Sequence, residues 1–252
     1  MKPLLPLTLF LLMPLLAFAQ AAKNDDEADQ SQLRREQCLN NLKEIALALH
    51  NHHDAYKQLP ATYTVDKDGK SLQSWRIAIL PYLGQVDLYN KIRKDEPWNS
   101  EYNKQFHNQC PAIFQCPEMA AKNPDIKKKG LTTYSVIVGK NAWPDGNLKY
   151  DMSMIPDGTS NTLAVVERKT PVCWMDPTQE IKQEDAEKGI NKLKTGLGGV
   201  HATGGMSACL FDGSTHIVSE NIKPEILKAL ITRNDSREIP PRGPFGPAEE
   251  HK

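Results

Sequence analysis

A stripe of apolar residues runs through residues 33–56 at the spacing of an α-helix. Its members follow one another at intervals of four, three, four and seven residues: Cys38, Leu42, Ile45, Leu49 and Tyr56. This spacing places them on one face of a helix, with charged and polar side chains on the other faces. Burying such apolar side chains contributes about 1.5–3 kcal/mol each. The helix must therefore pack along a broad apolar surface.

The rest of the chain predicts a mainly antiparallel sheet with long loops. Runs of β-forming residues occur at 131–139, 163–167 and 206–218, and a short final helix is predicted at 224–231. Asp212-Gly213 within the last run predicts a tight hairpin with positive φ at both central positions. A long helix followed by such strands predicts an α+β fold.

Residues 1–19 have the layout of a secretory signal peptide. An apolar run of about 15 residues is followed by small residues at Ala17 and Ala19. A helix that spans a bilayer takes about 20 residues, so we expect cleavage after Ala19 rather than a retained transmembrane anchor. The mature protein is then expected in the periplasm or outside the cell.

The remaining chain divides into three parts by composition. Residues 20–32 are acidic and predict a solvated linker, residues 33–232 form the folded domain, and the proline-rich residues 233–252 predict a disordered tail. The full chain has Lys+Arg 31 and Asp+Glu 31. This balance argues against a nucleic-acid partner, because such binders need a basic excess to displace counterions from phosphates.

The chain has five cysteines, and in an exported protein they can form disulfides because the compartment is oxidising. They are Cys38, Cys110, Cys116, Cys173 and Cys209. Cys110 and Cys116 lie six residues apart in a loop-rich stretch and form the candidate pair. Connectivity stays open, and an odd number leaves at least one thiol over. No CxxC pair is present, which argues against a zinc finger.

Three neighbouring residues are candidate metal ligands on the helix: His50, His53 and Asp54 lie within one turn of one another. The favoured interpretation is structural, with His50 and His53 reaching backbone or water at the edge of the apolar stripe and His52 facing solvent. We therefore predict no metal site and no cofactor.

The motifs of hydrolytic enzymes are missing, since the sequence has no GxSxG elbow. Ser160, Glu167 and His201 are the residue types of a catalytic triad, but their separation in sequence does not show whether they are in contact. No catalytic residue is assigned. The tryptophans and tyrosines form either a ligand platform or, as we favour, core and loop anchors: Trp75, Trp98, Trp143, Trp174, Tyr82, Tyr89 and Tyr134.

Short stretches spread over residues 33–220 match the blocks of a known family in the same order. They are residues 38–45 with 48–54, 74–82, 88–90 with 97–98, 114–117, 157–162 with Glu167, and 201–213. Together they resemble the DUF1559 family, pilin-like proteins of planctomycete-type bacteria. The resemblance implies a pseudopilin-like fold in which a long N-terminal helix lies across an antiparallel sheet.

The chain differs from this family at two places. Many members carry a prepilin-type leader with a retained hydrophobic helix, where this chain has a conventional signal peptide. The family motif of His, nine residues and Asp-Gly corresponds here to His201, ten residues and Asp212-Gly213.

These observations together predict an exported, non-enzymatic, pilin-like protein of the cell envelope that acts through contacts with an envelope protein or surface. Two alternatives stay open. One is an extracytoplasmic module that binds carbohydrate or peptide through its aromatic residues. The other is a metal-dependent hydrolase that uses His50, His53 and Asp54 with His201.

Overall fold

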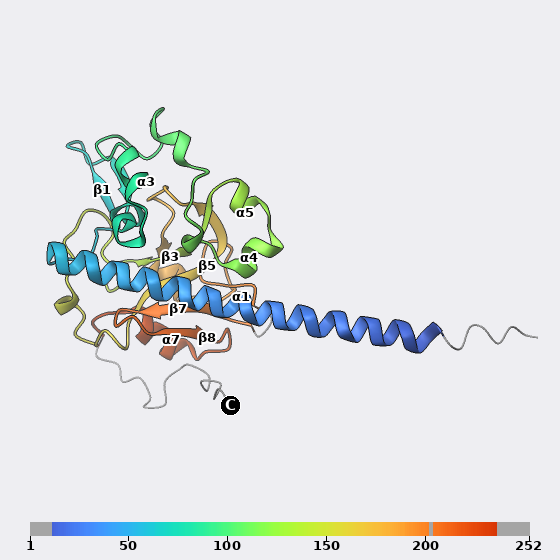
Figure 1. Cartoon of the computed structure of the whole chain (residues 1–252). Coiled ribbons are helices and arrows are strands. Elements are labelled where there is room, and N and C mark those ends of the chain that lie inside the picture. The colour runs from blue at the N-terminus through green and yellow to red at the C-terminus, as the bar shows by residue number, and fades with distance from the viewer. Residues whose placement is uncertain (1–11, 202–203, 236–252) are drawn as a thin grey trace, which may run out of the picture.

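The computed structural model describes residues 12–201 and 204–235. Residues 1–11 of the expected signal peptide and residues 236–252 of the expected tail lie outside this part. Within it, a long helix, α1 (Leu12–Tyr56), lies across a four-stranded antiparallel sheet (Figure 1). The predicted α+β class is confirmed.

The apolar stripe of α1 faces the body of the protein as predicted. Cys38, Leu42, Ile45 and Leu49 are at most 2% exposed, whereas Leu47 on the opposite face is 54% exposed. The prediction fails at Tyr56, which is 61% exposed. The helix ends at that residue, so its ring lies beyond the surface that the stripe covers and packs against His52 instead.

The helix begins earlier than predicted, so residues 20–32, expected as a linker, continue α1. No glycine or proline interrupts residues 15–59, and Ala and Gln, each present three times in residues 20–32, favour helix. Residues 26–30 are exposed, and this end of α1 projects from the body (Figure 1). Among the residues whose burial is described, Cys38 is the first on α1 to be buried.

The sheet has the strand order β3-β5-β7-β8 and separates two apolar layers. Its strands are β3 (Leu131–Ser135), β5 (Leu163–Cys173), β7 (Met206–Leu210) and β8 (Thr215–Val218). Cys209 packs in the layer that contains the stripe of α1, while its neighbours Ala208 and Leu210 pack with the final helix, α7 (Pro224–Ile231). Because both faces are covered, β7 is buried at every position.

The hairpin between β7 and β8 differs from the predicted tight turn. Only Gly213 has positive φ, at 89°, and residues 211–214 connect the strands. The Asp212 carboxylate accepts hydrogen bonds from the backbone and hydroxyl of Ser214, which stabilises a wider turn. The backbone N–H of Phe211 also donates to Thr162, so the neighbouring loop holds the turn open.

Small elements fill the long connections. Residues 75–92 form three short helical segments, and the Ser74 side chain caps the first of them by accepting from the backbone N–H of Arg76. The elements are β1 (Tyr63–Val65), β2 (Ser71–Ser74), α2 (Trp75–Ala78), η1 (Leu80–Leu83), α3 (Val86–Lys91), η2 (Asn103–Phe106), η3 (Ala112–Phe114), α4 (Pro117–Lys122), α5 (Asp125–Lys128), β4 (Ile137–Val138), η4 (Met152–Met154), β6 (Ile181–Lys182) and α6 (Gln183–Ala186).

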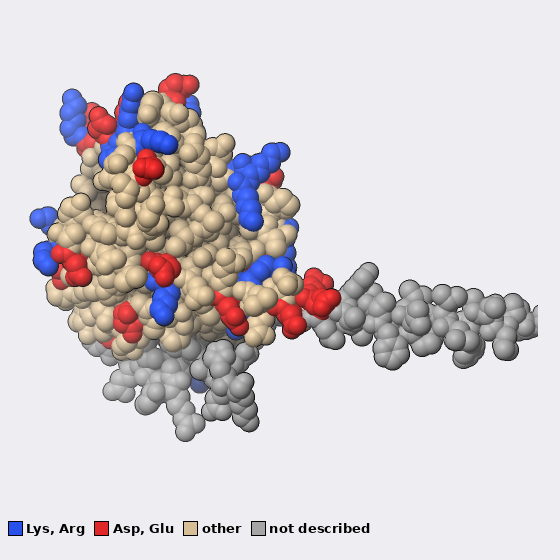
Figure 2. All heavy atoms as spheres, viewed as in Figure 1, with Lys and Arg blue, Asp and Glu red and all other residues tan. Residues whose placement is uncertain are grey.

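Charge is distributed without segregation on the face drawn in Figure 2. Basic and acidic side chains are interspersed there. No helix within the described residues combines the length and the apolarity that crossing a membrane requires.

Candidate functional site

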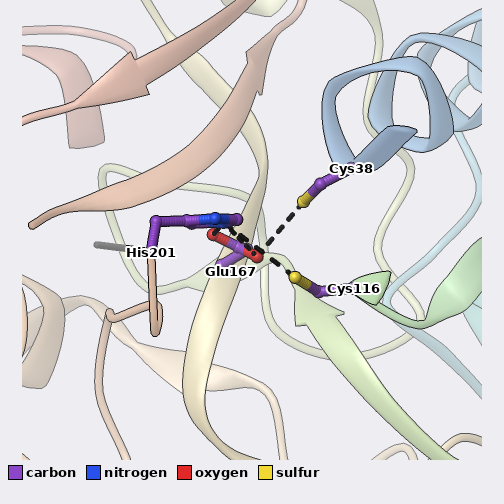
Figure 3. Close-up of side chains that lie close together, drawn as sticks. All are labelled: Cys38, Cys116, Glu167 and His201. Atoms are coloured by element: carbon purple, nitrogen blue, oxygen red, sulfur yellow. Dashed lines mark hydrogen bonds and ion pairs between the residues drawn. The ribbon is translucent and has the colours of Figure 1, made fainter. Parts of the chain in front are cut away.

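Four chemically reactive side chains from distant parts of the chain meet inside the protein (Figure 3). Cys38 comes from α1, Cys116 from the position before α4, Glu167 from β5 and His201 from the segment before β7. One donor atom from each lies within 4.8 Å of the others. Cys38, Cys116 and Glu167 are fully buried, and His201 is 6% exposed. We call this set the buried cluster.

Direct contacts join the members of the buried cluster. The Cys38 thiol donates to Glu167 Oε1 over 3.2 Å, and His201 Nε2 lies 3.0 Å from Glu167 Oε2. Cys116 Sγ lies 3.9 Å from the same nitrogen of His201. Glu167 is therefore at the centre, with the two sulfur atoms and the imidazole around it.

Hydrogen bonds from outside the cluster fix its members. The Ser207 backbone N–H donates to Glu167 Oε2 over 2.6 Å, and the Tyr134 hydroxyl donates to Cys38 Sγ over 3.0 Å. These contacts follow from the sheet, because Tyr134 on β3 is the register partner of Glu167 and β7 lies on the other side of β5. Gly199 leaves the necessary room, since a Cβ there would lie 2.9 Å from Glu167 Oε2.

Burial and mutual contacts shift the pKa values of the cluster in opposite directions. Burial alone would raise the pKa of Glu167, but hydrogen bonds from His201 and the positive charge of its ring lower it. Burial opposes the charged imidazole too, yet contacts with Cys116 and Glu167 raise the pKa of His201 to about 10. In the absence of any bound ion, the pair is a buried carboxylate and imidazolium.

The pKa values of the two thiols in the buried cluster shift in opposite directions. Burial raises the pKa of Cys38 well above its ordinary value. The nearby Cys38 thiol lowers the pKa of Cys116 despite its burial, and His201 contributes in the same direction. Cys116 is thus the sulfur with the greater thiolate character.

The buried cluster does not have the geometry of a catalytic triad. His201 and Glu167 do meet, but Ser160 is exposed and Ser207 takes the place next to the imidazole. In a triad the acid and the serine contact opposite ring nitrogens. Here Nε2 of His201 faces both, and Nδ1 has no partner among the described residues.

The predicted histidine candidates on α1 do not converge on one point. His50 Nε2 lies 2.7 Å from the Phe211 carbonyl, and His53 Nε2 lies 3.4 Å from Asp151 Oδ2. Asp54 is exposed. The favoured structural interpretation thus describes the contacts of His50. For His52 it is wrong, because this residue is 7% exposed and its Nδ1 lies 3.0 Å from the Gln58 carbonyl.

All five cysteines are free thiols in the structure. Cys116 contacts His201 rather than forming the predicted pair with Cys110. Cys110 and Cys173 are partly buried, and Cys209 is buried in the sheet. The six-residue spacing did not indicate the true neighbour of Cys116, because the chain brings Cys38 beside it from another element.

The family motif divides between two places. His201 belongs to the buried cluster, whereas Asp212 and Gly213 form the turn of the β7–β8 hairpin. The aromatic residues proposed as a platform are largely core: Trp75, Trp143, Trp174 and Tyr134 are at most 3% exposed. Trp98, Tyr82 and Tyr89 are partly buried against that core.

A second buried polar network lies among residues that no sequence motif marks. Arg76 Nη1 donates to Glu180 Oε1 over 2.6 Å, and Arg76 Nη2 donates to the Tyr134 carbonyl over 2.6 Å. Glu180 also accepts a hydrogen bond from the Ser135 hydroxyl. These contacts join residues from α2, β3 and the segment before β6, and their role is to tie these elements together.

Comparison with known proteins gives one match. The model of a family described as protein of unknown function, DUF1559, matches residues 32–195. No curated protein and no solved structure matches the chain. The matched range contains Cys38, Cys116 and Glu167 and ends before His201.

Proposed function

The chain belongs to the DUF1559 family, and on that premise we propose that it is an exported, non-enzymatic, pilin-like protein of the cell envelope. It acts in the periplasm or outside the cell through contacts with an envelope protein or surface. The signal-peptide layout of residues 1–19 supports export.

The division of α1 into two parts is the observation that carries this proposal. From Cys38 to Leu49 the apolar side chains are buried in the body, whereas residues 26–30 are exposed. We call residues 20–33, the part of α1 that precedes its buried face and remains after cleavage behind Ala19, the helical arm. A helix that continues from the folded body and is exposed at residues 26–30 is suited to contacts rather than to chemistry, as in pilin-like proteins.

Export is tested by the fate of the N-terminus. We expect the full chain, produced in a bacterium with a Sec pathway, to appear in the periplasmic fraction with Gln20 as its first residue. Ala19→Lys should block processing, because the signal peptidase needs a small side chain there. Ala22→Lys is the matched control and should be processed normally. A full-length chain in the cytoplasm would contradict export.

The contact role is tested by site-specific photo-cross-linking in the native envelope. A cross-linker in place of exposed Asp29, on the helical arm, should give a discrete adduct with an envelope component. The control position is Lys188, which is ion-paired to Asp185 on the body. No adduct from Asp29, or equal adducts from both positions, would count against the helical arm as the contact element.

A second candidate function, a peptide- or carbohydrate-binding module, is favoured by a cavity of about 280 Å³. Its lining includes His52, Pro60, Leu72, Tyr89 and Lys94. The aromatic ring and the ammonium group suit such ligands. A thermal shift with a glycan or peptide library that Tyr89→Ala abolishes would favour this alternative.

A further inference from the structure

We propose that the buried cluster binds one zinc ion in a closed structural centre. The ligands are Sγ of Cys38, Sγ of Cys116, a carboxylate oxygen of Glu167 and Nε2 of His201. This inference goes beyond the proposed function, because it concerns how the folded domain is held together and not where it acts.

The spacing of the donor atoms fits a tetrahedral ion. With Zn–S bonds of about 2.3 Å and Zn–N or Zn–O bonds of about 2.0–2.2 Å, ligand atoms lie about 3.3–3.8 Å apart. Here Cys38 Sγ to Glu167 Oε1 is 3.2 Å, Cys116 Sγ to His201 Nε2 is 3.9 Å, and no donor pair exceeds 4.8 Å. Side-chain adjustments that change these separations by about 1 Å or less bring all four donors to bonding distance.

The types of donor select the metal. Calcium and magnesium take oxygen ligands, of which Glu167 is the only source in the buried cluster. Two sulfurs, one imidazole nitrogen and one carboxylate oxygen suit zinc, which accepts all three kinds of ligand. The ion also compensates the charges of a carboxylate and two thiolates that burial would otherwise penalise.

Hydrogen bonds next to the cluster have the arrangement that orients metal ligands. The Tyr134 hydroxyl points to Cys38 Sγ, and the Ser207 N–H holds one oxygen of Glu167 while leaving the other for the ion. The Thr133 hydroxyl accepts from the backbone N–H of Cys116 over 2.5 Å. Such outer contacts fix the direction of Cys38, Cys116 and Glu167 before the ion binds.

The centre is structural because the protein supplies all four ligands. Catalytic zinc keeps one position for water, whereas structural zinc is enclosed. The ligands come from α1, the start of α4, β5 and the segment before β7, so one ion would join four parts of the chain. It would also hold α1 at Cys38, its first buried residue after the helical arm.

The first experiment measures metal in the full chain purified without a His tag. We expect close to one zinc per chain by elemental analysis. Replacement with Co²⁺ should give intense visible bands of a tetrahedral ion and a thiolate-to-cobalt charge-transfer band. Because zinc binding is coupled to folding, a strong chelator should lower Tm by at least about 10 °C, and zinc but not magnesium should restore it.

Variants locate the site. Cys116→Ser and His201→Ala should each lose the ion, with circular dichroism recorded to show that the variant is folded. The matched controls are Cys209→Ser, a buried thiol outside the cluster, and His53→Ala, and both should retain the ion. If the cluster variants do not fold, the cobalt spectrum of the wild-type chain still decides the question.

Three results would overturn the proposal. The first is folded wild-type protein that takes up neither zinc nor cobalt. The second is metal retained in folded Cys116→Ser and His201→Ala. The third is protein from an oxidising compartment in which Cys38 and Cys116 are linked as a disulfide and no metal is bound. Each is read on purified protein, so it is independent of the export and cross-linking tests.

Discussion

At the scale of single residues, Glu167 is a fully buried carboxylate whose charge must be compensated by its neighbours. Its carboxylate is 0% exposed and contacts His201, Cys38 and the backbone of Ser207. Removing one partner of a buried charge pair costs about 3–5 kcal/mol. We expect Glu167→Gln to lower the free energy of unfolding by about that amount, measured by urea denaturation.

The control for this prediction is Asp125→Asn. Asp125 forms an ion pair with Lys129 in which both side chains are more than half exposed. Exposed pairs contribute little because water and salt screen them. Equal losses in the two variants would show that Glu167 is not held as described.

The stability of the metal-free protein should depend on pH through the same pair. Glu167 has a lowered pKa, so its contribution is complete above its ordinary value of 4.5 and is lost as pH falls. His201 has a pKa raised to about 10, so its contribution is complete below 6.5 and is lost as pH rises toward 10. The pKa of Cys38 is raised and that of Cys116 is lowered, so the two thiols have opposite effects on how the free energy of unfolding depends on pH.

We therefore expect maximal free energy of unfolding between about pH 4.5 and 6.5 and a decline from pH 6.5 to 9, measured by urea denaturation with chelator present. His201→Gln should lack the alkaline decline. A free energy that increases over that interval in the wild-type protein is the contrary outcome.

The buried cluster shows what residue-level reasoning misses. His50, His53 and Asp54 attracted attention because they are adjacent in sequence, and the fold directs two of them to separate partners. The residues that do meet are separated by long stretches of chain. Their signal was that each lies in a stretch resembling the family, but only strand register brings Tyr134, Glu167 and Ser207 together.

At the scale of elements, the two faces of α1 offer a matched pair of leucines. Leu42 is 0% exposed and Leu47 is 54% exposed. Leu42→Ala should cost about 2–5 kcal/mol in free energy of unfolding, because it leaves a cavity in a packed core. Leu47→Ala should change it by no more than about 0.5 kcal/mol. Chemical denaturation of both variants checks this, and comparable losses would mean that the stripe is not the packed face.

A pair of glycines tests the β7–β8 region. Both Gly205 and Gly213 have positive φ, which costs other residues about 1–2 kcal/mol. A Cβ at Gly205 would lie 2.3 Å from the Val218 carbonyl, whereas one at Gly213 meets nothing within 4 Å. The free energy of unfolding of Gly205→Ala should therefore be about 1–3 kcal/mol lower than that of Gly213→Ala, measured by urea denaturation. The reverse order would contradict the turn described.

Elements were predictable where a single local rule governs them. The stripe of α1 and the final helix follow from spacing and from Pro224 at a helix start. The hairpin turn was not, because its conformation depends on Phe211 bonding to Thr162 in another loop. The extension of α1 through the acidic stretch does not follow from composition, because residues that favour solvent can lie in an exposed helix as well as in a linker.

At the scale of the whole molecule, the helix-then-sheet order predicted the α+β class but not its layers. The sequence did not reveal that α7 covers the second face of the sheet. Every residue of β7 is buried, so this strand lacks the alternation of apolar and polar residues that marks a sheet with one solvent-exposed face.

The helical arm should be dispensable for the stability of the body. Deleting residues 1–32 should leave Tm within about 2 °C, because residues 26–30 are exposed. Deleting residues 1–39 should lower it strongly, because that change removes Cys38 and the ion pair of Arg34 with Glu118. Thermal unfolding of both variants is the measurement, and a large fall in the shorter deletion would show that the arm packs on the body.

The continuity of α1 has a mechanical consequence. After cleavage behind Ala19, and at a rise of about 1.5 Å per residue, the helix from Gln20 to Cys38 is about 27 Å long. A tensile load applied at the N-terminal end of this helix would reach Cys38 before any other residue of α1 that is described as buried. The resistance of the protein to such a load is then set by how firmly that one turn of helix is fastened.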